Sequence, residues 1–379
     1  MAGFYQDFTV GILGGGQLGR MLIQAATDWN VDIHILDPAE NAPCAHLAKE
    51  FTQGALTDFD TVYEFGKKCD LITIEIENVN TQALQKLSDE GVKVFPQPKV
   101  ISLIQDKRLQ KQFYLEKGIP TAPFVLVENA DDVRKHSYRL PTVNKLGRAG
   151  YDGRGVQVLR TEEDLAKGFD DPGILEDLID FDKEISVIVA RNEHREVSTF
   201  PAVEMAFHPT ANLVEFLFSP AQIEDTIANQ ASEIAKKVIT ELDMVGLLAV
   251  EMFVTKDGQV LVNEVAPRPH NSGHQTIEAN ITSQYHQHLR SILGLPLGHT
   301  ASRVPSAMVN LLGEDGHTGM ARVEGLEEAL AIPGVYVHLY GKKTTKPFRK
   351  MGHVTVVDTD EANLRKTARK VKDLIRIIA

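Results

Sequence analysis

Two apolar runs joined through Asp257-Gly258 constrain the fold of this chain more than any other feature. The runs are LLAVEMFV (247–254) and QVLVNEV (259–265), and Asp-Gly between such runs is a strong β-hairpin signal. With those two residues as the turn, the antiparallel register places Glu251 opposite Glu264. Like charges facing each other in an apolar pair of strands are costly, so we predict that the two carboxylates hold a divalent metal, with Mg²⁺ and phosphate oxygens favoured. The alternatives are two rim glutamates, or a register moved by a β-bulge.

Composition restricts the class of protein. The chain has 379 residues, enough for two or three domains, and its 43% hydrophobic and 24% charged content is ordinary for a globular protein. A net charge of -12 argues against a nucleic-acid partner or an anionic membrane surface. Cys44 and Cys69 are too few for a disulfide framework, and no signal-like or membrane-length apolar run is present. We therefore expect a cytoplasmic protein with neither nucleic acid nor a membrane as partner.

The first 104 residues indicate a doubly wound α/β unit. A strand over 8–13 is followed by the glycine-rich segment 14–19, a helix from Arg20, and a second strand that ends at Asp37. This βαβ order with G-x-G-x-x-G predicts a nest of backbone N–H groups for an anion, although such a fingerprint is also common in doubly wound sheets that bind no dinucleotide. A further strand over 71–76 carries acids at its end, where a ligand can reach them.

The central region carries polar segments between apolar strands. We expect an amphipathic helix over 102–117 and interpret its Asp106-Lys107-Arg108 as a solvated face. The loop LGRAGYDGRG (146–155) suits phosphate binding by backbone amides, although it lacks the ending of a P-loop and a mobile surface hairpin is the alternative. Segment 174–191 predicts a strand, an acidic turn and a strand. Residues 176–179 can offer backbone groups to a purine edge, and Glu184 can accept from ribose hydroxyls.

Two later segments indicate anion binding. The hairpin continues into APRPHNSGH (266–274), which two prolines stiffen and which crowds Arg268, His270 and His274 beside the predicted metal. The last part, from about residue 301, combines short strands and a C-terminal helix over 361–377 with a basic cluster. In an acidic chain this cluster suggests a phosphate site, with a solvated loop as the alternative. Its members are Lys342, Lys343, Lys346, Arg349 and Lys350.

Taken in order, the segments carry the motifs of one family. They are GGGQLGRM (14–21), IEIENV (74–79), QDKRLQK (105–111), GYDGRG (150–155), NEVAPRPHNSGH (263–274), SQYHQHLRSILGLPLG (283–298) and RKMGH (349–353). The chain resembles, nearly end to end, the ATP-grasp ligases of purine biosynthesis, specifically the 5-(carboxyamino)imidazole ribonucleotide synthases. The resemblance implies an α/β protein, α+β in its central part, with an ATP-grasp fold. It also implies a doubly wound, Rossmann-like N-terminal domain (1–104), an ATP-grasp domain (105–300, lid subdomain about 118–175) and a C-terminal domain (301–379).

The resemblance further implies the reaction and the site. Such enzymes use ATP, Mg²⁺ and bicarbonate to carboxylate the exocyclic amine of aminoimidazole ribonucleotide through carboxyphosphate, and they are homodimers. By position, the implied ATP-binding residues are Arg108, Lys145, Gly150, Tyr151, Asp152, Gly153, Arg154, Gly155, Glu176, Asp177, Leu178, Ile179, Glu184, His208, Asn263 and Glu264. The implied substrate-binding residues are Gln17, Leu18, Glu75, Arg268, Ser272, His274, Lys342, Arg349 and Lys350. The metal ligands are Glu251 and Glu264, and the catalytic residues are Arg268, His270, Asn271, Tyr151 and Arg154.

Three other functions compete with this one. Another ATP-grasp enzyme, such as the formate-dependent glycinamide ribonucleotide transformylase, would share the ATP site and differ in its acceptor. An NAD-dependent oxidoreductase built on GGGQLG would leave the facing carboxylates and GYDGRG unexplained. A non-catalytic nucleotide-binding module would bind ATP without releasing ADP.

Overall fold

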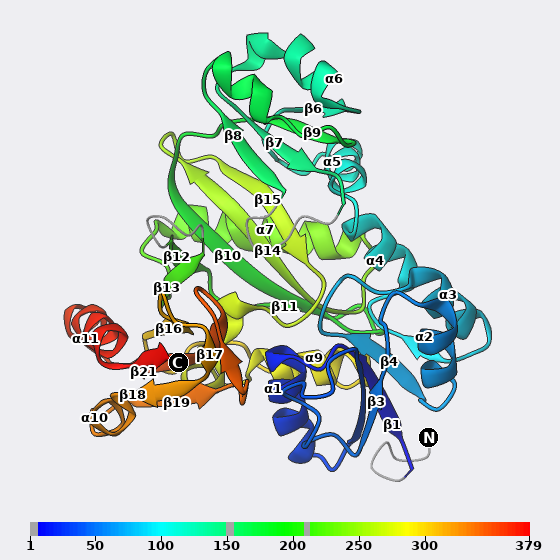
Figure 1. Cartoon of the computed structure of the whole chain (residues 1–379), viewed down its shortest axis with the longest axis vertical. Helices are drawn as coiled ribbons and strands as arrows, with labels where there is room; N and C mark the ends of the chain where they lie inside the picture. Colours follow the sequence, from blue (N-terminus) through cyan, green and yellow to red (C-terminus); the bar gives the residue numbers. More distant parts are fainter. Residues whose placement is uncertain (1–6, 149–154, 208–212) are drawn as a thin grey trace.

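The computed structural model describes residues 7–148, 155–207 and 213–379, and its three sheets of four or more strands are spread along the long axis of the molecule (Figure 1). A five-stranded and a nine-stranded sheet occupy the lower and middle parts of that view, and a four-stranded sheet lies at the upper end. Within the described residues, no helix combines the length and apolar character needed to cross a bilayer.

The N-terminal sheet is parallel, with the strand order β3-β2-β1-β4-β5. Its strands are β1 (Thr9–Leu13), β2 (Asp32–Asp37), β3 (Glu50–Gln53), β4 (Leu71–Ile74) and β5 (Lys93–Val94). The helices of this part are α1 (Gln17–Thr27), α2 (Phe59–Gly66), α3 (Thr81–Asp89) and α4 (Pro98–Ile104). Alternate strand residues face opposite sides of a sheet, so Val10 and Ile12 pack with α1, whereas Leu13 and Ile74 pack with α2 and α3. The predicted βαβ opening is confirmed.

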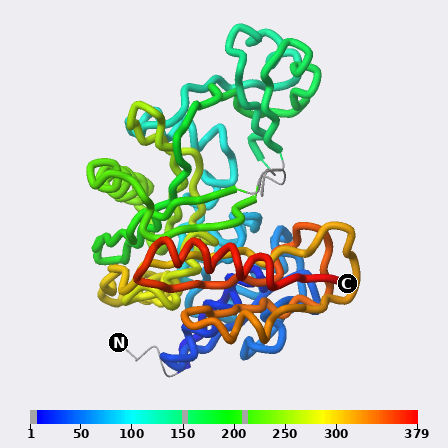
Figure 2. The backbone as a smooth tube through the Cα atoms, turned by 90° about the vertical axis from the view of Figure 1, so that its left-hand side faces the viewer, coloured from blue at the N-terminus to red at the C-terminus, as the bar shows by residue number. Residues whose placement is uncertain are grey.

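The four-stranded sheet is antiparallel and has the order β6-β9-β7-β8. It contains β6 (Phe124–Val127), β7 (Thr142–Leu146), β8 (Val156–Leu159) and β9 (Gly173–Asp177), with α5 (Lys107–Glu116), α6 (Ala130–Lys135), η1 (Ser137–Arg139) and η2 (Glu163–Lys167) nearby in the sequence. Figures 1 and 2 both place it at the opposite end of the long axis from the N-terminal sheet. Residues 178–180 connect it to the large sheet.

The large sheet runs β15-β14-β10-β12-β13-β16-β21-β19, with β11 beside β10, and all its pairs are antiparallel. Its strands are β10 (Phe181–Arg191), β11 (Val197–Thr199), β12 (Val203–Phe207), β13 (Val214–Ser219), β14 (Gly246–Thr255), β15 (Val260–Ala266), β16 (Ser306–Leu312), β19 (Val335–Leu339) and β21 (Lys350–Val357). Helix α7 (Asp225–Glu241) packs on one face through Ala235 and Val238 against Val187 and Val250. The C-terminal strands therefore extend the sheet that carries the hairpin.

The remaining elements complete these layers. Helix α11 (Glu361–Leu374) covers β16 and β21 through Leu364, Ala368 and Val371. The others are η3 (Asn271–Gly273), α8 (Thr276–Ala279), α9 (Gln284–Ile292), β17 (Gly319–Met320), β18 (Arg322–Glu324), α10 (Leu326–Leu330), β20 (Thr344–Thr345) and β22 (Arg376–Ile378). The C-terminal helix ends at Leu374, three residues before its predicted end, because the chain then becomes extended and pairs with β18.

The helix predicted over 102–117 is two helices. α4 ends at Ile104, and Asp106 caps the start of α5 by accepting a hydrogen bond from the Arg108 backbone N–H (3.0 Å). The prediction of a solvated face for Asp106-Lys107-Arg108 is wrong for Asp106, whose residue surface is only 2% exposed. Asp106 pairs with Arg108 instead, and Lys107 reaches Glu264 on β15.

Candidate active site

The hairpin of β14 and β15 pairs Glu251 with Glu264, as the sequence predicts, but through a different register. The predicted two-residue turn is wrong: Thr255 donates its N–H to Gln259 O (2.9 Å), so the loop has three residues and Gly258 takes φ +82°. The pairing then follows Val254↔Val260 and Met252↔Val262 until a β-bulge at Asn263 shifts it by one residue. The longer loop and the bulge offset each other, which restores the predicted carboxylate pair.

The bulge residue Asn263 belongs to a buried charge cluster. Its Oδ1 accepts from Lys145 Nζ (2.9 Å), and Lys145 also pairs with Glu176 (3.0 Å). Lys111, from α5, pairs with the second oxygen of Glu176 (3.1 Å) and donates to the Thr121 hydroxyl. Burial acts to raise the pKa of Glu176, but Lys145 and Lys111 outweigh it and hold that pKa below its ordinary value. Both lysines therefore lie beside a carboxylate that stays charged.

Lys107 and Lys111 both lie in the QDKRLQK motif, but the sequence analysis assigned neither of them to the site. Lys107 Nζ lies 2.5 Å from Glu264 Oε2, and Lys107 precedes Lys111 by one helical turn, so both lysines extend from one face of α5. The N-terminal half of α5 thus lies beside the Glu251–Glu264 pair and beside the charge cluster that contains Lys145. The spacing of four residues between Lys107 and Lys111 could have indicated two lysines on one helix face directed at a common anion. The segment was instead interpreted as a solvated face.

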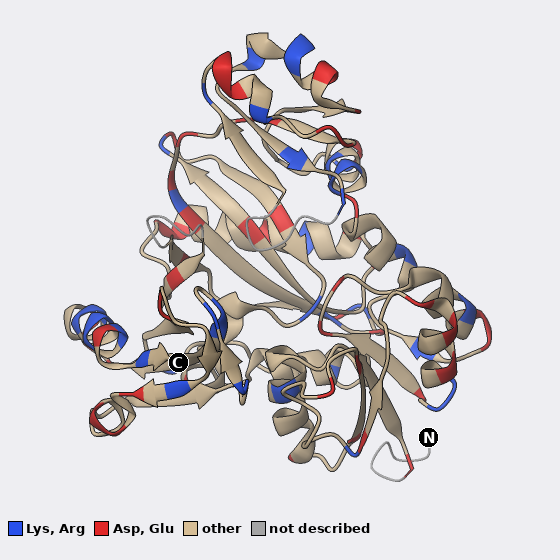
Figure 3. Cartoon of the chain, viewed as in Figure 1, with Lys and Arg blue, Asp and Glu red and all other residues tan. Residues whose placement is uncertain are grey.

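The carboxylate pair is electrostatically unequal. Lys107 holds the pKa of Glu264 below its ordinary value, whereas burial, then Glu264 and Glu184, raise the pKa of Glu251 to about 8. Burial also raises the pKa of Glu184 to about 7. Figure 3 shows acidic segments side by side in the middle of the large sheet, where β10, β14 and β15 run. The strands therefore concentrate negative charge on the face turned away from α7.

The donor set fits a Mg²⁺ ion shared with phosphate oxygens. Two facing carboxylates and the Asn263 amide supply oxygens, and the pKa of Glu251 is raised first by burial and then by the charges of Glu264 and Glu184, both of which a bound cation would offset. Among residues 7–148, 155–207 and 213–379, no three His, Cys, Asp or Glu side chains gather closely enough to hold a metal by themselves. The remaining ligands would therefore come from the nucleotide and water.

Metal binding should depend on pH because Glu251 has to lose its proton. Below about pH 8 we expect the affinity for Mg²⁺, measured by calorimetry with ADP present, to rise up to about tenfold per pH unit, and above it to level off. In the metal-free protein the same raised pKa stabilises the fold at low pH, and this stabilisation is lost as pH rises from about 4.3 through about 8. Glu251→Gln should flatten both profiles. A pH-independent affinity in the unmodified chain would contradict the assignment.

The loop after β15 brings two predicted residues to this site. His270 Nε2 lies 3.5 Å from Glu251 Oε1, and Arg268 Nε lies 2.8 Å from Glu77 Oε1. Gln284 fixes the loop by accepting from His270 N–H (2.8 Å) and donating to His270 O (2.7 Å). The loop therefore spans from the carboxylate pair to the acidic segment after β4, with Asn271 and Ser272 in the short helix η3.

Ser272 and His274 are placed differently. The Ser272 hydroxyl contacts His270 Nδ1 (2.9 Å) and the Ser186 hydroxyl (2.8 Å), so it orients the His270 ring. His274 is 1% exposed, bonds to the Tyr285 hydroxyl through Nδ1 (3.0 Å) and packs on the His353 ring, with centroids 4.6 Å apart. Burial holds the pKa of His274 well below its ordinary value. His274 therefore packs in the interior beneath the 266–274 loop, where its contacts with Tyr285 and His353 hold the loop in place.

The glycine-rich segment holds the chain's own carboxylates. Glu75 accepts from Gly16 N–H (2.8 Å) and Gly19 N–H (2.9 Å), and Asp37 accepts from Gly15 N–H (2.7 Å). A Cβ at Gly14 or Gly16 would come within 2.4 or 2.5 Å of the Glu75 side chain. The glycines are therefore needed for this close approach. The predicted anion nest exists, and Glu75, beside Gln17 and Leu18 at the start of α1, occupies it.

The basic cluster reaches the carboxylate pair through β21. Lys350, the first residue of that strand, lies close enough to Glu251 and His274 for its charge to lower the pKa of both. Lys342 Nζ donates to Lys350 O (2.7 Å), and Arg349 Nη1 donates to Thr344 O (2.7 Å) and Oγ1 (2.9 Å). Lys350 therefore begins a strand, which argues against the alternative that the whole cluster is a solvated loop.

Other predicted residues lie at the edges of the site. Arg108 pairs with Asp106 (2.8 Å), Asp177 pairs with Arg139, and Leu178 and Ile179 belong to the connection between the two antiparallel sheets. Gly155 takes φ +72° and accepts from Leu146 N–H (2.9 Å). Six predicted positions lie outside the described residues: Gly150, Tyr151, Asp152, Gly153, Arg154 and His208.

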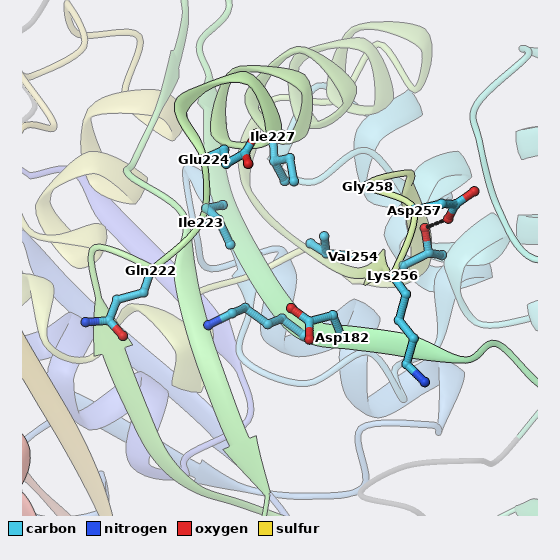
Figure 4. Close-up of a pocket in the computed structure, with 11 residues that line it drawn as sticks. Asp182, Gln222, Ile223, Glu224, Ile227, Val254, Lys256, Asp257 and Gly258 are labelled. Carbon is cyan, nitrogen blue, oxygen red and sulfur yellow. Dashed lines mark hydrogen bonds between the residues drawn. The ribbon is translucent and has the colours of Figure 1, made fainter.

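A surface depression at the hairpin turn is a separate feature (Figure 4). It lies between the start of α7, the start of β10 and the turn, and Val254, Lys256 and Glu224 line it. Val254 packs on the α7 side of β14, whereas the odd-numbered Glu251 faces the other side. The depression therefore does not open onto the carboxylate pair, and we assign it no role in the chemistry.

Comparison with known proteins agrees with this geometry. Residues 8–105 match the ribonucleotide synthetase preATP-grasp domain, 112–285 the ATP-grasp domain, and 306–367 the phosphoribosylaminoimidazole carboxylase C-terminal domain. The N5-carboxyaminoimidazole ribonucleotide synthase of Bacillus subtilis is 38% identical over 364 residues, which are 94% of this chain and 93% of that protein. The chain belongs to the N5-carboxyaminoimidazole ribonucleotide synthase family.

Solved structures of synthases from this family match the fold over nearly the whole chain. The crystal structure of the synthetase from Thermotoga maritima superposes with a TM-score of 0.91 at 40% identity, covering 98% of this chain and 99% of that one. A synthase from Aspergillus clavatus, in complex with ADP and 5-aminoimidazole ribonucleotide, gives 0.89 at 32% identity, covering 98% and 99%. The chloroplastic phosphoribosylaminoimidazole carboxylase of Vigna aconitifolia is 39% identical over 94% of this chain, but the chain spans only 65% of its length.

Proposed function

We propose that this chain carboxylates the exocyclic amine of 5-aminoimidazole ribonucleotide, using ATP and bicarbonate, in de novo purine biosynthesis. The products would be N5-carboxyaminoimidazole ribonucleotide, ADP and phosphate. The observation that carries the proposal is the meeting of Glu251 and Glu264 with lysines of α5 and β7 on one side, and His270 and Lys350 on the other. Phosphoryl transfer needs such a combination of acidic metal ligands and cations around it.

The two groups of cations suggest a division of labour. Lys107, Lys111 and Lys145 lie where the four-stranded sheet meets the hairpin, and we assign them to the phosphates of ATP. The connection at 178–179 and Glu184 would contact the base and ribose. Arg268, Lys342, Arg349 and Lys350 would hold the ribonucleotide, whose ribose would lie near Glu75 and Gln17.

The chemistry proceeds in two displacements. A bicarbonate oxygen attacks the γ-phosphorus, the bond to the β-phosphate oxygen breaks, and ADP leaves. The amine nitrogen then attacks the carbonyl carbon of carboxyphosphate, the bond to the phosphate oxygen breaks, and the amine proton passes to the departing phosphate. His270 donates toward the oxygens that gain charge, and Ser272 keeps its ring oriented. A Mg²⁺ ion bound by Glu251, Glu264 and the phosphates would neutralise charge during the transfer.

The same proposal covers the cofactor, the co-substrate, the assembly and the location. We assign Mg²⁺ as the metal and bicarbonate as the co-substrate, because the oxygen donor set suits the first and the reaction requires the second. The resemblance to the synthases supports a homodimer, which sedimentation would test. Cys44 and Cys69 are both buried free thiols, in keeping with a cytoplasmic location.

ADP release tests the proposal directly. With Mg²⁺ and ATP present, release should require both bicarbonate and 5-aminoimidazole ribonucleotide, and the labelled carbon of bicarbonate should appear in the ribonucleotide. Formate with glycinamide ribonucleotide serves as the control acceptor pair. ADP release with that pair, and none with bicarbonate, would assign the chain to a different ligase.

Arg349→Ala should raise the KM for the ribonucleotide about tenfold or more, because a hydrogen bond to a charged phosphate is worth roughly 1.5 to 3 kcal/mol. The KM for ATP should change less than about twofold. Arg349→Lys should restore only part of the loss, since lysine lacks the bidentate fork. Lys366→Ala, which removes an exposed cation from α11, is the control. A rise confined to the KM for ATP would move the basic cluster to the nucleotide site.

A further inference from the structure

Asp106 is a buried carboxylate that neither the motifs nor the proposed chemistry assigns. As the N-cap of α5 it needs to accept only one backbone hydrogen bond, from Arg108 N–H (3.0 Å). It also accepts from Arg108 Nε (3.0 Å) and Nη2 (2.8 Å), and from Nε of the distant Arg148 (3.2 Å). A residue 2% exposed thus holds two guanidinium groups together. A helix cap alone does not require either of them.

The surrounding backbone is shaped to bring these groups together. Lys107 N–H donates to Gly147 O (2.8 Å), and Gly147 N–H donates to Pro172 O (2.9 Å), so the start of α5 is docked on the residue after β7. A Cβ on Gly147 would lie 2.9 Å from Arg108 Nε and 3.2 Å from Asp106 Oδ1. Glycine at 147 therefore permits the contact between the capped helix and the arginine pair.

The docking also sets the position of Lys107. Lys107 is the residue directly after the cap Asp106, and its backbone N–H is bonded to Gly147 O. Its side chain extends from this fixed point to Glu264 (2.5 Å). Burial acts to raise the pKa of Asp106, but hydrogen bonds from Arg108 and Arg148 hold it below its ordinary value. One charged carboxylate thus fixes three cations: two directly, and one through the helix start.

We propose that Asp106 is a positioning residue of the ATP site, which holds Arg108 and Arg148 side by side for the phosphates and keeps Lys107 on Glu264. The inference rests on the proposed function only in naming ATP as the ligand. Two guanidinium groups on one carboxylate leave a net positive charge and unused N–H donors, which is the chemistry that binds a polyphosphate chain. Asp106 acts through these cations and need not touch the nucleotide.

Asp106→Asn separates positioning from capping, because asparagine caps a helix about as well as aspartate but carries no charge. We expect the KM for ATP to rise about tenfold or more, and the KM for the ribonucleotide to change less than about twofold. The rise in unfolding temperature caused by ADP should shrink as well. Asp360→Asn is the matched control, since Asp360 caps α11 by accepting from Asn363 N–H (2.9 Å). That variant should retain both KM values and the full effect of ADP.

Three outcomes would decide the matter. A KM for ATP within about twofold of the unmodified chain would leave Asp106 as a helix cap only and overturn the inference. Equal rises in both KM values, with a larger loss of unfolding temperature than in Asp360→Asn, would also overturn it by showing a general structural role. The unmodified chain could also turn over no ribonucleotide while ADP raises the unfolding temperature of Asp106→Asn less than that of the unmodified chain. In that case the proposed reaction fails and the positioning role stands.

Discussion

Glu264→Gln should reduce turnover on the order of a thousandfold or more while leaving the chain folded. The substitution removes the carboxylate that faces Glu251 and pairs with Lys107 (2.5 Å), so it removes both the proposed metal ligand and the partner of a partly buried cation. Single-turnover measurement of ADP formation at saturating Mg²⁺ reports the loss. Glu251→Gln should act similarly, and the double variant should cost little beyond the worse single one, since the two residues act as a unit.

A carboxylate elsewhere on the same sheet provides the control. Glu204 on β12 pairs with Lys183 (2.8 Å) and resembles Glu264 in carrying a lysine partner. Glu204→Gln should keep turnover within about threefold of the unmodified chain. Near-normal turnover in Glu264→Gln or Glu251→Gln would show that the facing carboxylates hold no essential metal.

Lys145→Ala should raise the KM for ATP by about tenfold to a hundredfold. Its ammonium group contacts Glu176 on β9 (3.0 Å) and Asn263 (2.9 Å), which is the bulge residue of the hairpin that carries Glu251 and Glu264. Unfolding by urea should also report a loss of stability of roughly 3 kcal/mol or more, because Glu176 stays buried and, among the described residues, keeps Lys111 alone as a lysine partner.

The KM for the ribonucleotide separates these effects. It should stay within about threefold in Lys145→Ala, because we assign the ribonucleotide to Arg268 and the basic cluster and not to Lys145. Lys183→Ala removes a lysine from a Lys–Glu pair on the large sheet and should leave both KM values unchanged. If Lys145→Ala destabilises the chain without altering the KM for ATP, Lys145 serves the fold and not the nucleotide.

Local patterns predicted most elements but not how distant segments meet. The βαβ opening, the strands around Glu176 and the Glu251–Glu264 pair follow from periodicity and turn chemistry, which act over a few residues. Asn263 shows the limit: no local rule places a bulge there, and the pair was predicted because the bulge compensates for a longer turn. A register can thus be right for one pair and shifted for its neighbours.

Sequence patterns failed to predict site residues whose side chains could lie either in solvent or against a distant segment. Lys107 and Asp106 look like surface charges in an amphipathic segment, and only the docking of α5 on Gly147 and Glu264 buries Asp106 and brings Lys107 to Glu264. Glu75 is a similar case, because the glycine pattern indicates an anion site but not that a carboxylate 56 residues further along occupies it. Long-range contacts decide such cases, and sequence spacing does not encode them.

Because the central and C-terminal parts share the large sheet, the chain cannot readily be cut into separate fragments between them. Strands β13 and β16 pair through Phe216↔Val309 and Leu217↔Met308, so the seam between the central and C-terminal parts consists of ladder hydrogen bonds between apolar residues. A fragment cut in the stretch before β16 would expose β13 as an unprotected edge, and its complement would expose β16. Open apolar edges recruit other strands and aggregate. Recombination or fusion at this boundary is therefore disfavoured, although sequence profiles divide the chain there.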